Sequence, residues 1–370
     1  MPHSFHFFGS TLIGIYLAFH LYFLWWADRY FSPSRRSSRA FKFWLLAMAL
    51  LFPAAEYFEG RAAGGLSDAF IWLGFFWLGA MFILVTVLLL CDLLFLAIRF
   101  FRPGWRRALG ASALTLAAAL IALAVFRGAA LPEVRPVDIA LRGLPAALDG
   151  FKIVQISDVH IGRIVTVGKF RRLAALVNAS RPDLIVFTGD ITERGVEDPE
   201  EVCSVIRSMN AVYGKAGVLG NHDSFAGPDN SAAFFEACGV KMLRFVKYEP
   251  VPGLQVAGVD SPRRGAPAVR TLDLLLSDLS PSRPLLFLSH RPDMPEQVLK
   301  GFQALALGGH THEGQLYPFG LLERHLFKYF YGLYRVGGSS VYVTSGAGTW
   351  GPPMRLFTVS ELPLFVLHPA

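Results

Sequence analysis

Five short apolar runs in the second half of the sequence each lead into side chains that can bind metal ions. The runs are rich in branched residues and are typical of buried strands. The clusters that follow them are Asp158-Val159-His160, Gly189-Asp190, Gly220-Asn221-His222-Asp223, Ser289-His290 and Gly309-His310-Thr311-His312. One such cluster alone is explained by ordinary residue usage. Five in succession, each after a strand-like run, indicate a single functional site.

Helical patterns separate some of these runs. Val167–Ala179 and Glu200–Met209 carry apolar residues at helical spacing, and a third pattern begins at Ser231. Asp198 and Pro199 are a typical cap and first residue for the second of these helices. Strands that alternate with helices predict an α/β fold, in which active sites lie at the carboxyl ends of the strands. We therefore expect the five clusters to converge.

The pooled side chains are carboxylates, imidazoles and one amide, which together suit divalent metals such as Mn, Fe or Zn. Two such ions about 3.5–4 Å apart can hold the attacking and leaving oxygens of a phosphoryl displacement in line. Asp223 follows His222 directly and is expected to orient its imidazole. Four glycines should let the backbone approach the ions closely, namely Gly189, Gly220, Gly308 and Gly309.

In this order the five clusters resemble the calcineurin-like metallophosphoesterase superfamily. The sequence is most similar to its membrane-attached bacterial branch of phosphohydrolases, over roughly residues 134–370. The run Gly346-x-Gly348-Thr349-Trp350-Gly351-x-Pro353-x-Arg355 also looks like that branch. Glu313 is a departure, because the branch usually carries glycine after the last histidine of the set.

The resemblance implies a four-layer α/β/β/α sandwich with two divalent metal ions. Asp158, His160 and His312 would hold the first ion, and Asn221, His290 and His310 the second. Asp190 would bridge the two ions. His222 would protonate the leaving oxygen or steady the transition state, with Asp223 behind it. The reaction implied is hydrolysis of a phosphate ester by water that the metals activate.

Residues 1–130 differ in texture and predict an all-α transmembrane domain ahead of the catalytic domain at 131–370. Four apolar segments are long enough to be considered as spans. They are Phe7–Trp26, Phe41–Tyr57, Ala69–Ile98 and Ala108–Phe126. The second is the weakest, because Pro53 interrupts it. The first lacks the basic start and cleavage site of a signal peptide and precedes further apolar runs, so we interpret it as a span.

Charge places the ends of this domain. Residues 1–130 hold 11 Lys/Arg against 5 Asp/Glu, whereas residues 131–370 hold 24 against 23. The basic excess therefore belongs to the membrane domain, and no basic stripe indicates a nucleic-acid partner. The loops after the first and third segments are rich in arginine, so both are expected to be cytoplasmic. The catalytic domain would then lie outside the cytoplasm of a bacterial inner membrane.

Two features are left open by the residues alone. Asp92 lies inside the third apolar segment, either as a functional carboxylate or as a partner near Arg99. Cys203 and Cys238 lack the short spacing of a zinc site and would pair only in an oxidising compartment.

The substrate is less constrained than the reaction. The membrane domain favours a lipid-linked or envelope-associated phosphate. The aromatic and basic stretch Leu316–Val336 fits a membrane interface, or else its aromatics pack against the sandwich. Two alternatives are a UDP-diacylglucosamine pyrophosphohydrolase, which acts in the cytoplasm, and a membrane sensor with a vestigial site.

Overall fold

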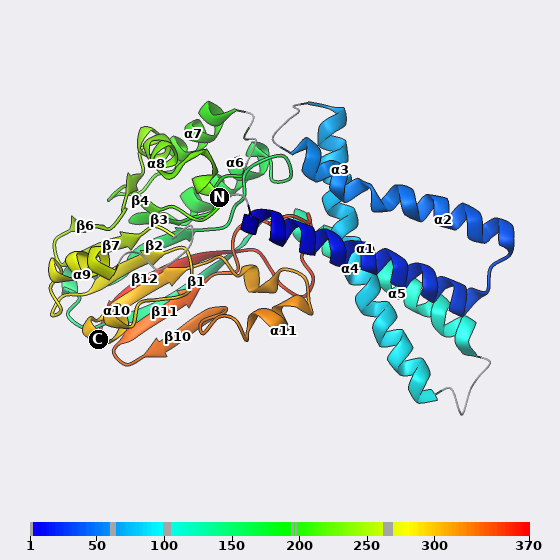
Figure 1. Ribbon diagram of the computed structural model, residues 1–370. Coiled ribbons are helices and arrows are strands. Elements are labelled where there is room, and N and C mark those ends of the chain that lie inside the picture. Colours follow the sequence, from blue (N-terminus) through cyan, green and yellow to red (C-terminus); the bar gives the residue numbers. More distant parts are fainter. Residues whose placement is uncertain (1–2, 60–63, 99–104, 194–195, 197, 262–268) are drawn as a thin grey trace. The chain divides into compact units, whose positions relative to one another are not determined.

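The chain divides into two compact units in a computed structural model (Figure 1). The structure describes the chain apart from residues 1–2, 60–63, 99–104, 194–195, 197 and 262–268. The first unit comprises Met1–Ala129 together with Gly351–Leu356, and the second comprises Ala130–Trp350 and Phe357–Ala370. The sequence indicates the division near residue 130 but not the return of six late residues to the first unit.

The first unit is helical throughout its described residues. Its helices are α1 (His3–Phe31), α2 (Arg35–Ala49), α3 (Leu51–Phe58), α4 (Leu66–Ile98) and α5 (Arg106–Ala129). Three helical stretches in the described part are long and apolar enough to cross a membrane, at Arg35–Phe58, Leu66–Ala97 and Arg106–Ala129. The first expected span lies within α1, which is not one of the three, so a fourth span stays a prediction.

Asp92, near the end of α4, accepts hydrogen bonds from two tyrosines. The hydroxyls of Tyr22 and Tyr30, about two helical turns apart on α1, donate to its two carboxylate oxygens at 2.7 and 2.8 Å. Tyr30 is fully buried and stacks on Trp26. Asp92 thus joins α1 to α4. Its other expected partner, Arg99, lies outside the described residues.

The segment Gly351–Leu356 packs into the helical unit through two helix glycines. A Cβ atom on Gly79 of α4 would meet Pro352 at 2.8 Å, and one on Gly128 of α5 would meet the Pro353 carbonyl at 2.6 Å. The Arg355 amide donates to the Ala124 carbonyl at 2.9 Å, and the Arg355 side chain is fully buried. The two glycines therefore make the space that this segment occupies.

The second unit confirms the α/β fold, with two sheets in its described residues. The first sheet has the order β1 (Glu133–Leu141), β12 (Glu361–Pro369), β2 (Phe151–Ile156), β3 (Leu184–Thr188), β4 (Lys215–Val218) and β5 (Lys241–Met242). The second has the order β10 (Gly332–Val336), β11 (Ser339–Val343), β9 (Ala304–Gly308), β8 (Leu285–Ser289), β7 (Leu254–Val259) and β6 (Val246–Val251).

The sheets face one another and helices cover their outer faces, which gives four layers. Neighbouring residues on a strand point into different cores, as the twofold repeat of a strand requires. In β2, Ile153 faces the core between the sheets, whereas Val154 faces a core shared with Phe170 of α6 (Val167–Ala179). In β8, Leu286 faces the core between the sheets and Phe287 the outer one.

The three predicted helices are present, and the third begins at Pro228, three residues before the start that the sequence suggested. With α6, the helices α7 (Pro199–Ser208) and α8 (Pro228–Ala237) cover the first sheet, and α9 (Val269–Ser277) and α10 (Glu296–Gly301) cover the second. Figure 1 shows α6, α7 and α8 together on one side of the strands. Asp198 caps α7 by accepting from the Glu201 amide at 3.0 Å, and Pro199 follows it, as predicted.

Cys203 of α7 and Cys238 at the end of α8 form a disulfide. Both are buried in the core between the helices and the first sheet. The bridge closes a loop of 35 residues that contains Asn221 and His222. Constraining a loop of this length in the unfolded chain stabilises the fold by about 2–4 kcal/mol.

We expect the double variant Cys203→Ala/Cys238→Ala to lose about 2–4 kcal/mol of stability for this reason. Thermal melting of the full-length protein in detergent should show a transition several degrees lower. The matched control is Cys91→Ala, which removes a buried but unpaired thiol. A reducing agent should lower the melting temperature of the wild type and not that of the double variant. No change in either case would contradict the role of the bridge.

Candidate metal centre

The five clusters lie at the carboxyl ends of five strands from both sheets. In the first sheet β2, β3 and β4 are parallel neighbours, and in the second β8 and β9 are parallel neighbours. Parallel neighbours end at the same edge, so the loops after them come together. The structure brings the side chains of four of these loops within a few ångströms of one another, and the fifth adds Asn221 and His222.

Asp158, His160 and His312 form the first group. Their ligand atoms lie within 4.8 Å of one another, and all three residues are buried. The Nε2 atoms of His160 and His312 are 3.0 Å apart, and His312 Nε2 is 3.4 Å from an Asp158 oxygen. Two imidazole nitrogens and a carboxylate oxygen that face the same small space are a ligand set for a divalent metal.

Asp190, His290 and His310 form the second group. His290 Nε2 is 3.1 Å from an Asp190 oxygen and 3.2 Å from His310 Nδ1. His290 Nδ1 donates to the Thr188 carbonyl at 2.9 Å, which leaves Nε2 to face the site. The same Asp190 oxygen is 3.9 Å from His160 Nε2 of the first group. Asp190 thus lies between the two groups, as a bridging carboxylate would.

Asn221 also has the properties expected of a metal ligand. Its side-chain oxygen is buried and has no hydrogen-bond partner among the described residues. A buried acceptor without a donor costs free energy, so such an atom is expected to bind something. The residues present therefore fit two divalent ions.

Glu193 is a site residue that the sequence analysis missed. One of its carboxylate oxygens lies 2.6 Å from His160 Nδ1 and 2.8 Å from His222 Nδ1. It therefore holds a candidate metal ligand and the candidate catalytic imidazole at once. A carboxylate behind a metal-binding histidine fixes the orientation and tautomer of the ring. Its position three residues after Asp190, in the same loop, is the one pattern that could have marked it.

Asp223 does not take the place expected of it. Both of its oxygens accept hydrogen bonds from backbone amides, namely those of Asp190 at 2.7 Å, Ile191 at 2.9 Å, Thr192 at 2.9 Å and Gly220 at 3.0 Å. The contact to the His222 ring is made by Glu193 instead. Asp223 is fully buried and shapes the backbone that carries Asp190, so its role is to position the loop.

The backbone of the site is strained at its ligands. Asp158, His160, Asp190, His310 and His312 all have positive φ, between 49° and 72°. Side chains other than glycine rarely adopt this conformation, which costs of order 1 kcal/mol or more per residue. Glu313 has φ 55°, which explains why glycine is favoured at its position.

Two of the four predicted glycines are needed because carboxylates lie against them. A Cβ atom on Gly220 would come within 2.1 Å of an Asp190 oxygen. A Cβ atom on Gly309 would come within 2.1 Å of an Asp158 oxygen. These glycines therefore let the backbone approach the carboxylates.

Burial and charge shift the pKa values at the site in opposite directions. Burial raises the pKa of Asp158, and burial would raise that of Asp190 too, but nearby His290 holds the Asp190 pKa well below its usual value. The pKa of Glu193 is lowered to about 2, because its hydrogen bonds to His160 and His222 outweigh its burial. Despite burial, Glu193 raises the pKa of His222 to about 8, and Asp190 raises that of His290 to about 9.

Trp350 forms one wall of the site. Its ring centroid is 5.7 Å from that of His222. Gln315 holds the Trp350 backbone at both polar groups: its amide nitrogen donates to the carbonyl at 2.9 Å, and its oxygen accepts from the amide at 2.8 Å. The sequence run from Gly346 to Arg355 thus supplies the neighbour of the candidate catalytic histidine.

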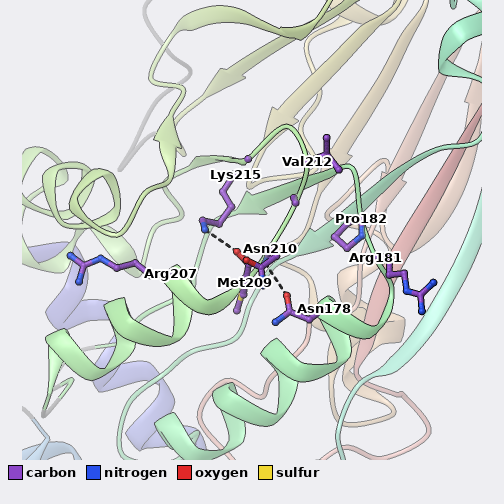
Figure 2. A pocket seen from close by; sticks show the side chains of 10 residues that line it. Asn178, Arg181, Pro182, Arg207, Met209, Asn210, Val212 and Lys215 are labelled. Carbon is purple, nitrogen blue, oxygen red and sulfur yellow. Dashed lines mark hydrogen bonds between the residues drawn. The ribbon is translucent and has the colours of Figure 1, made fainter.

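A separate cleft of about 550 Å³ lies near the opposite ends of the strands, lined by residues such as Asn178, Arg181, Arg207 and Lys215 (Figure 2). Its cations do not converge. Lys215 donates to the Met209 carbonyl at 3.0 Å, and Arg207 bonds Glu200 and the Ala237 carbonyl. Figure 2 shows Arg181 and Arg207 pointing in opposite directions. The metal centre, and not this cleft, is therefore the candidate active site.

Comparison with known proteins agrees with this geometry. The family model for calcineurin-like phosphoesterase matches residues 151–314. The uncharacterised metallophosphoesterase YkuE of Bacillus subtilis is 31% identical over 241 residues, which cover 60% of this chain and 81% of that protein. An uncharacterised metallophosphoesterase of Aquifex aeolicus is 30% identical over 57% of this chain and 82% of its own length.

A relative from Danio rerio also carries a membrane part in its name. The "Transmembrane protein with metallophosphoesterase domain" is 30% identical over 276 residues, or 70% of this chain. The match covers 62% of that relative's length. The strand-end ligand groups, the two-sheet fold and these relatives lead to one conclusion: the chain belongs to the calcineurin-like metallophosphoesterase family, whose members are phosphoester hydrolases that depend on two metal ions.

Proposed function

We propose that this protein hydrolyses phosphomonoester or phosphodiester bonds of a lipid-linked or envelope-associated phosphate, at the outer face of a bacterial inner membrane. The proposed hydrolysis is supported above all by the two buried ligand groups, with Asp190 between them. The proposed membrane location is supported by the three apolar helices. The substrate class follows from the two together, because a membrane-anchored enzyme meets phosphates held in the envelope.

In this proposal the residues keep the roles that the family implies. Asp158, His160 and His312 would hold one ion, Asn221, His290 and His310 would hold the other, and Asp190 would contact both. Divalent cations there supply Lewis acidity, which polarises the phosphoryl oxygens and makes water a better nucleophile near neutral pH. The ligand mix suits Mn, Fe or Zn, and availability decides among them.

His222 is the group that would exchange a proton with the leaving oxygen. It is not fully buried, and its Nδ1 is held by Glu193 at 2.8 Å, so in this proposal its Nε2 faces the substrate. Glu193 also holds His160 Nδ1. One carboxylate therefore couples the orientation of the proton donor to that of a metal ligand.

The extracytoplasmic placement is supported by two independent features. Arginines gather at the start of α2 and again just before and at the start of α5, and both groups would stay in the cytoplasm. Crossing of α5 would then put the catalytic unit outside. The Cys203–Cys238 disulfide fits the same side, because disulfides persist in oxidising compartments. Both features disfavour the cytoplasmic pyrophosphohydrolase. The complete ligand set disfavours a vestigial sensor.

The full-length protein in detergent with Mn²⁺ should hydrolyse bis-p-nitrophenyl phosphate or p-nitrophenyl phosphate, and a chelator should abolish the reaction. His222→Ala should lower kcat by about 10²–10⁴, as expected for loss of a general acid. Asp190→Asn should lower both activity and bound metal. His325→Ala is the matched control, because that histidine is exposed and outside the clusters. Hydrolysis that is absent, or equal in His222→Ala and the wild type, would sink the proposal.

Glu193→Gln should lower kcat by about 10–100-fold and weaken metal binding by a similar factor, because it loosens two histidines at once. Metal content by elemental analysis and kcat at saturating Mn²⁺ separate the two effects. Glu200→Gln, on the exposed face of α7, is the control. If Glu193→Gln retained full metal content and full kcat, the carboxylate would have no positioning role.

Reporter fusions after Ala370 test the placement. An alkaline phosphatase fusion should be active and a green fluorescent protein fusion dark, since each folds on one side of the membrane. The reverse pattern would put the catalytic unit in the cytoplasm and revive the pyrophosphohydrolase reading. Substituting the arginines at 35, 36 and 39 with glutamine should weaken the preference, because positive loop charges set orientation.

A further inference from the structure

We propose that the catalytic unit contacts the bilayer a second time, through an exposed apolar surface beside the metal centre. We call this surface the apolar rim. It consists of Tyr317, Phe319, Leu321, Leu322, Leu326 and Phe357. The inference rests on the proposed function for its membrane anchor and deepens it by naming the partner, a phospholipid surface. The rim would hold the mouth of the site at the lipid headgroups.

The stretch from Leu316 to Val336 divides into an inner and an outer face. Tyr329 and Phe330 are buried, so part of the aromatic set packs against the fold. The outer face is different: Leu322 and Leu326 are 66% and 75% exposed. Phe357 is 67% exposed and its ring lies 6.0 Å from that of Tyr317, which joins a distant part of the chain to the same surface.

The rim is attached directly to the metal centre. Helix α11 (Phe319–Glu323) packs on the turn that carries His312, since a Cβ atom on Gly314 would meet the Gly320 backbone. Beyond the helix, the Phe327 ring centroid is 5.7 Å from that of His310. The exposed side chains thus belong to a segment that contacts the turn carrying His312 and the ring of His310, one proposed ligand of each metal ion.

Exposure of this kind points to a partner. Single exposed apolar residues are normal on proteins, and contiguous ones mark interaction surfaces. Other large exposed apolar residues of this unit, such as Val212, Val246 and Leu274, lie far apart in the sequence. The rim holds five within ten residues and adds Phe357 by contact.

Charge and chain length favour a bilayer as that partner. Arg324, His325 and Lys328 are exposed among the rim residues, and Lys328 has one acidic neighbour, Glu296, at 3.8 Å. Basic residues beside leucine and aromatics suit the anionic headgroup region. Residues 130–132 link the end of α5 to the start of β1 and span at most about 14 Å, so a short link joins the catalytic unit to an apolar helix.

The test uses the full-length chain in lipid nanodiscs that contain phosphatidylethanolamine and phosphatidylglycerol. In a Cys91→Ala background, Leu322→Cys is labelled with the environment-sensitive dye NBD. Val212→Cys is the matched control: it is 76% exposed and lies just before β4, at the other end of that strand from the site. Nanodiscs with doxyl-labelled lipids should quench the dye at 322, with a blue-shifted emission, and leave the dye at 212 unchanged.

The outcome separates this inference from the proposed function. Each labelled protein is also assayed with bis-p-nitrophenyl phosphate, which is soluble and needs no membrane contact. Hydrolysis with equal, weak quenching at both sites would overturn the rim as a membrane surface and leave the hydrolase standing. Quenching at 322, together with no hydrolysis by the wild type, would support the rim as a membrane surface and overturn the proposed hydrolase function. Adding Arg324→Gln and Lys328→Gln should reduce the quenching at 322 if the headgroup charge contributes.

Discussion

The catalytic unit depends on burying two carboxylates, Asp158 and Asp190, at the same place. Each is fully enclosed, and burial of an ionised carboxylate costs several kcal/mol unless it is compensated. The compensation comes from imidazoles and from amides such as those of His310 and His222, which donate to Asp158 and Asp190 at 2.8–3.1 Å. Divalent ions would complete it. The demand for positive partners is therefore built into the fold.

This demand explains why the site lies at strand ends and not within them. A carboxylate can accept hydrogen bonds from the backbone amides of another loop only if that loop turns sharply beside it. The ligands turn through positive φ, and Gly220 and Gly309 remove the Cβ atoms that would block the approach. Parallel strands from both sheets supply rigid supports from which these turns start. The strain is tolerated because the two sheets and their common core hold both ends of each loop.

Much of this was predictable because its causes are local in the sequence. A buried strand that ends in Asp158 or Asp190 shows both the apolar run and the polar cluster, so the α/β fold and the ligand candidates follow. Glu193 was missed because its partners, His160 and His222, lie about thirty residues away on either side and no local pattern marks the contact. Asp223 was misjudged for the converse reason. Its adjacency to His222 suggested a contact with that ring, but the Asp223 carboxylate instead accepts hydrogen bonds from the buried amides of residues 190–192.

Contacts between residues far apart in the sequence could not be predicted for the same reason. Pairing of β1 with β12 joins residues more than two hundred positions apart. Packing of Gly351–Leu356 into the helical unit depends on Gly79 and Gly128, which as sequence are two glycines in apolar helices. Only the folded chain shows that they make room for a segment of the other half.

The proposed orientation of the membrane unit does not depend on whether α1 is a span. If α1 crosses, the arginine-rich start of α2 would lie inside and the start of α1 outside. If α1 lies along the surface or packs on the other helices, these arginines would still stay inside, because their charges and not α1 would set the orientation. In both cases the proposed topology would take Arg35–Phe58 out, Leu66–Ala97 back and Arg106–Ala129 out again. The catalytic unit would reach the same side, where an oxidising environment would keep Cys203 and Cys238 joined.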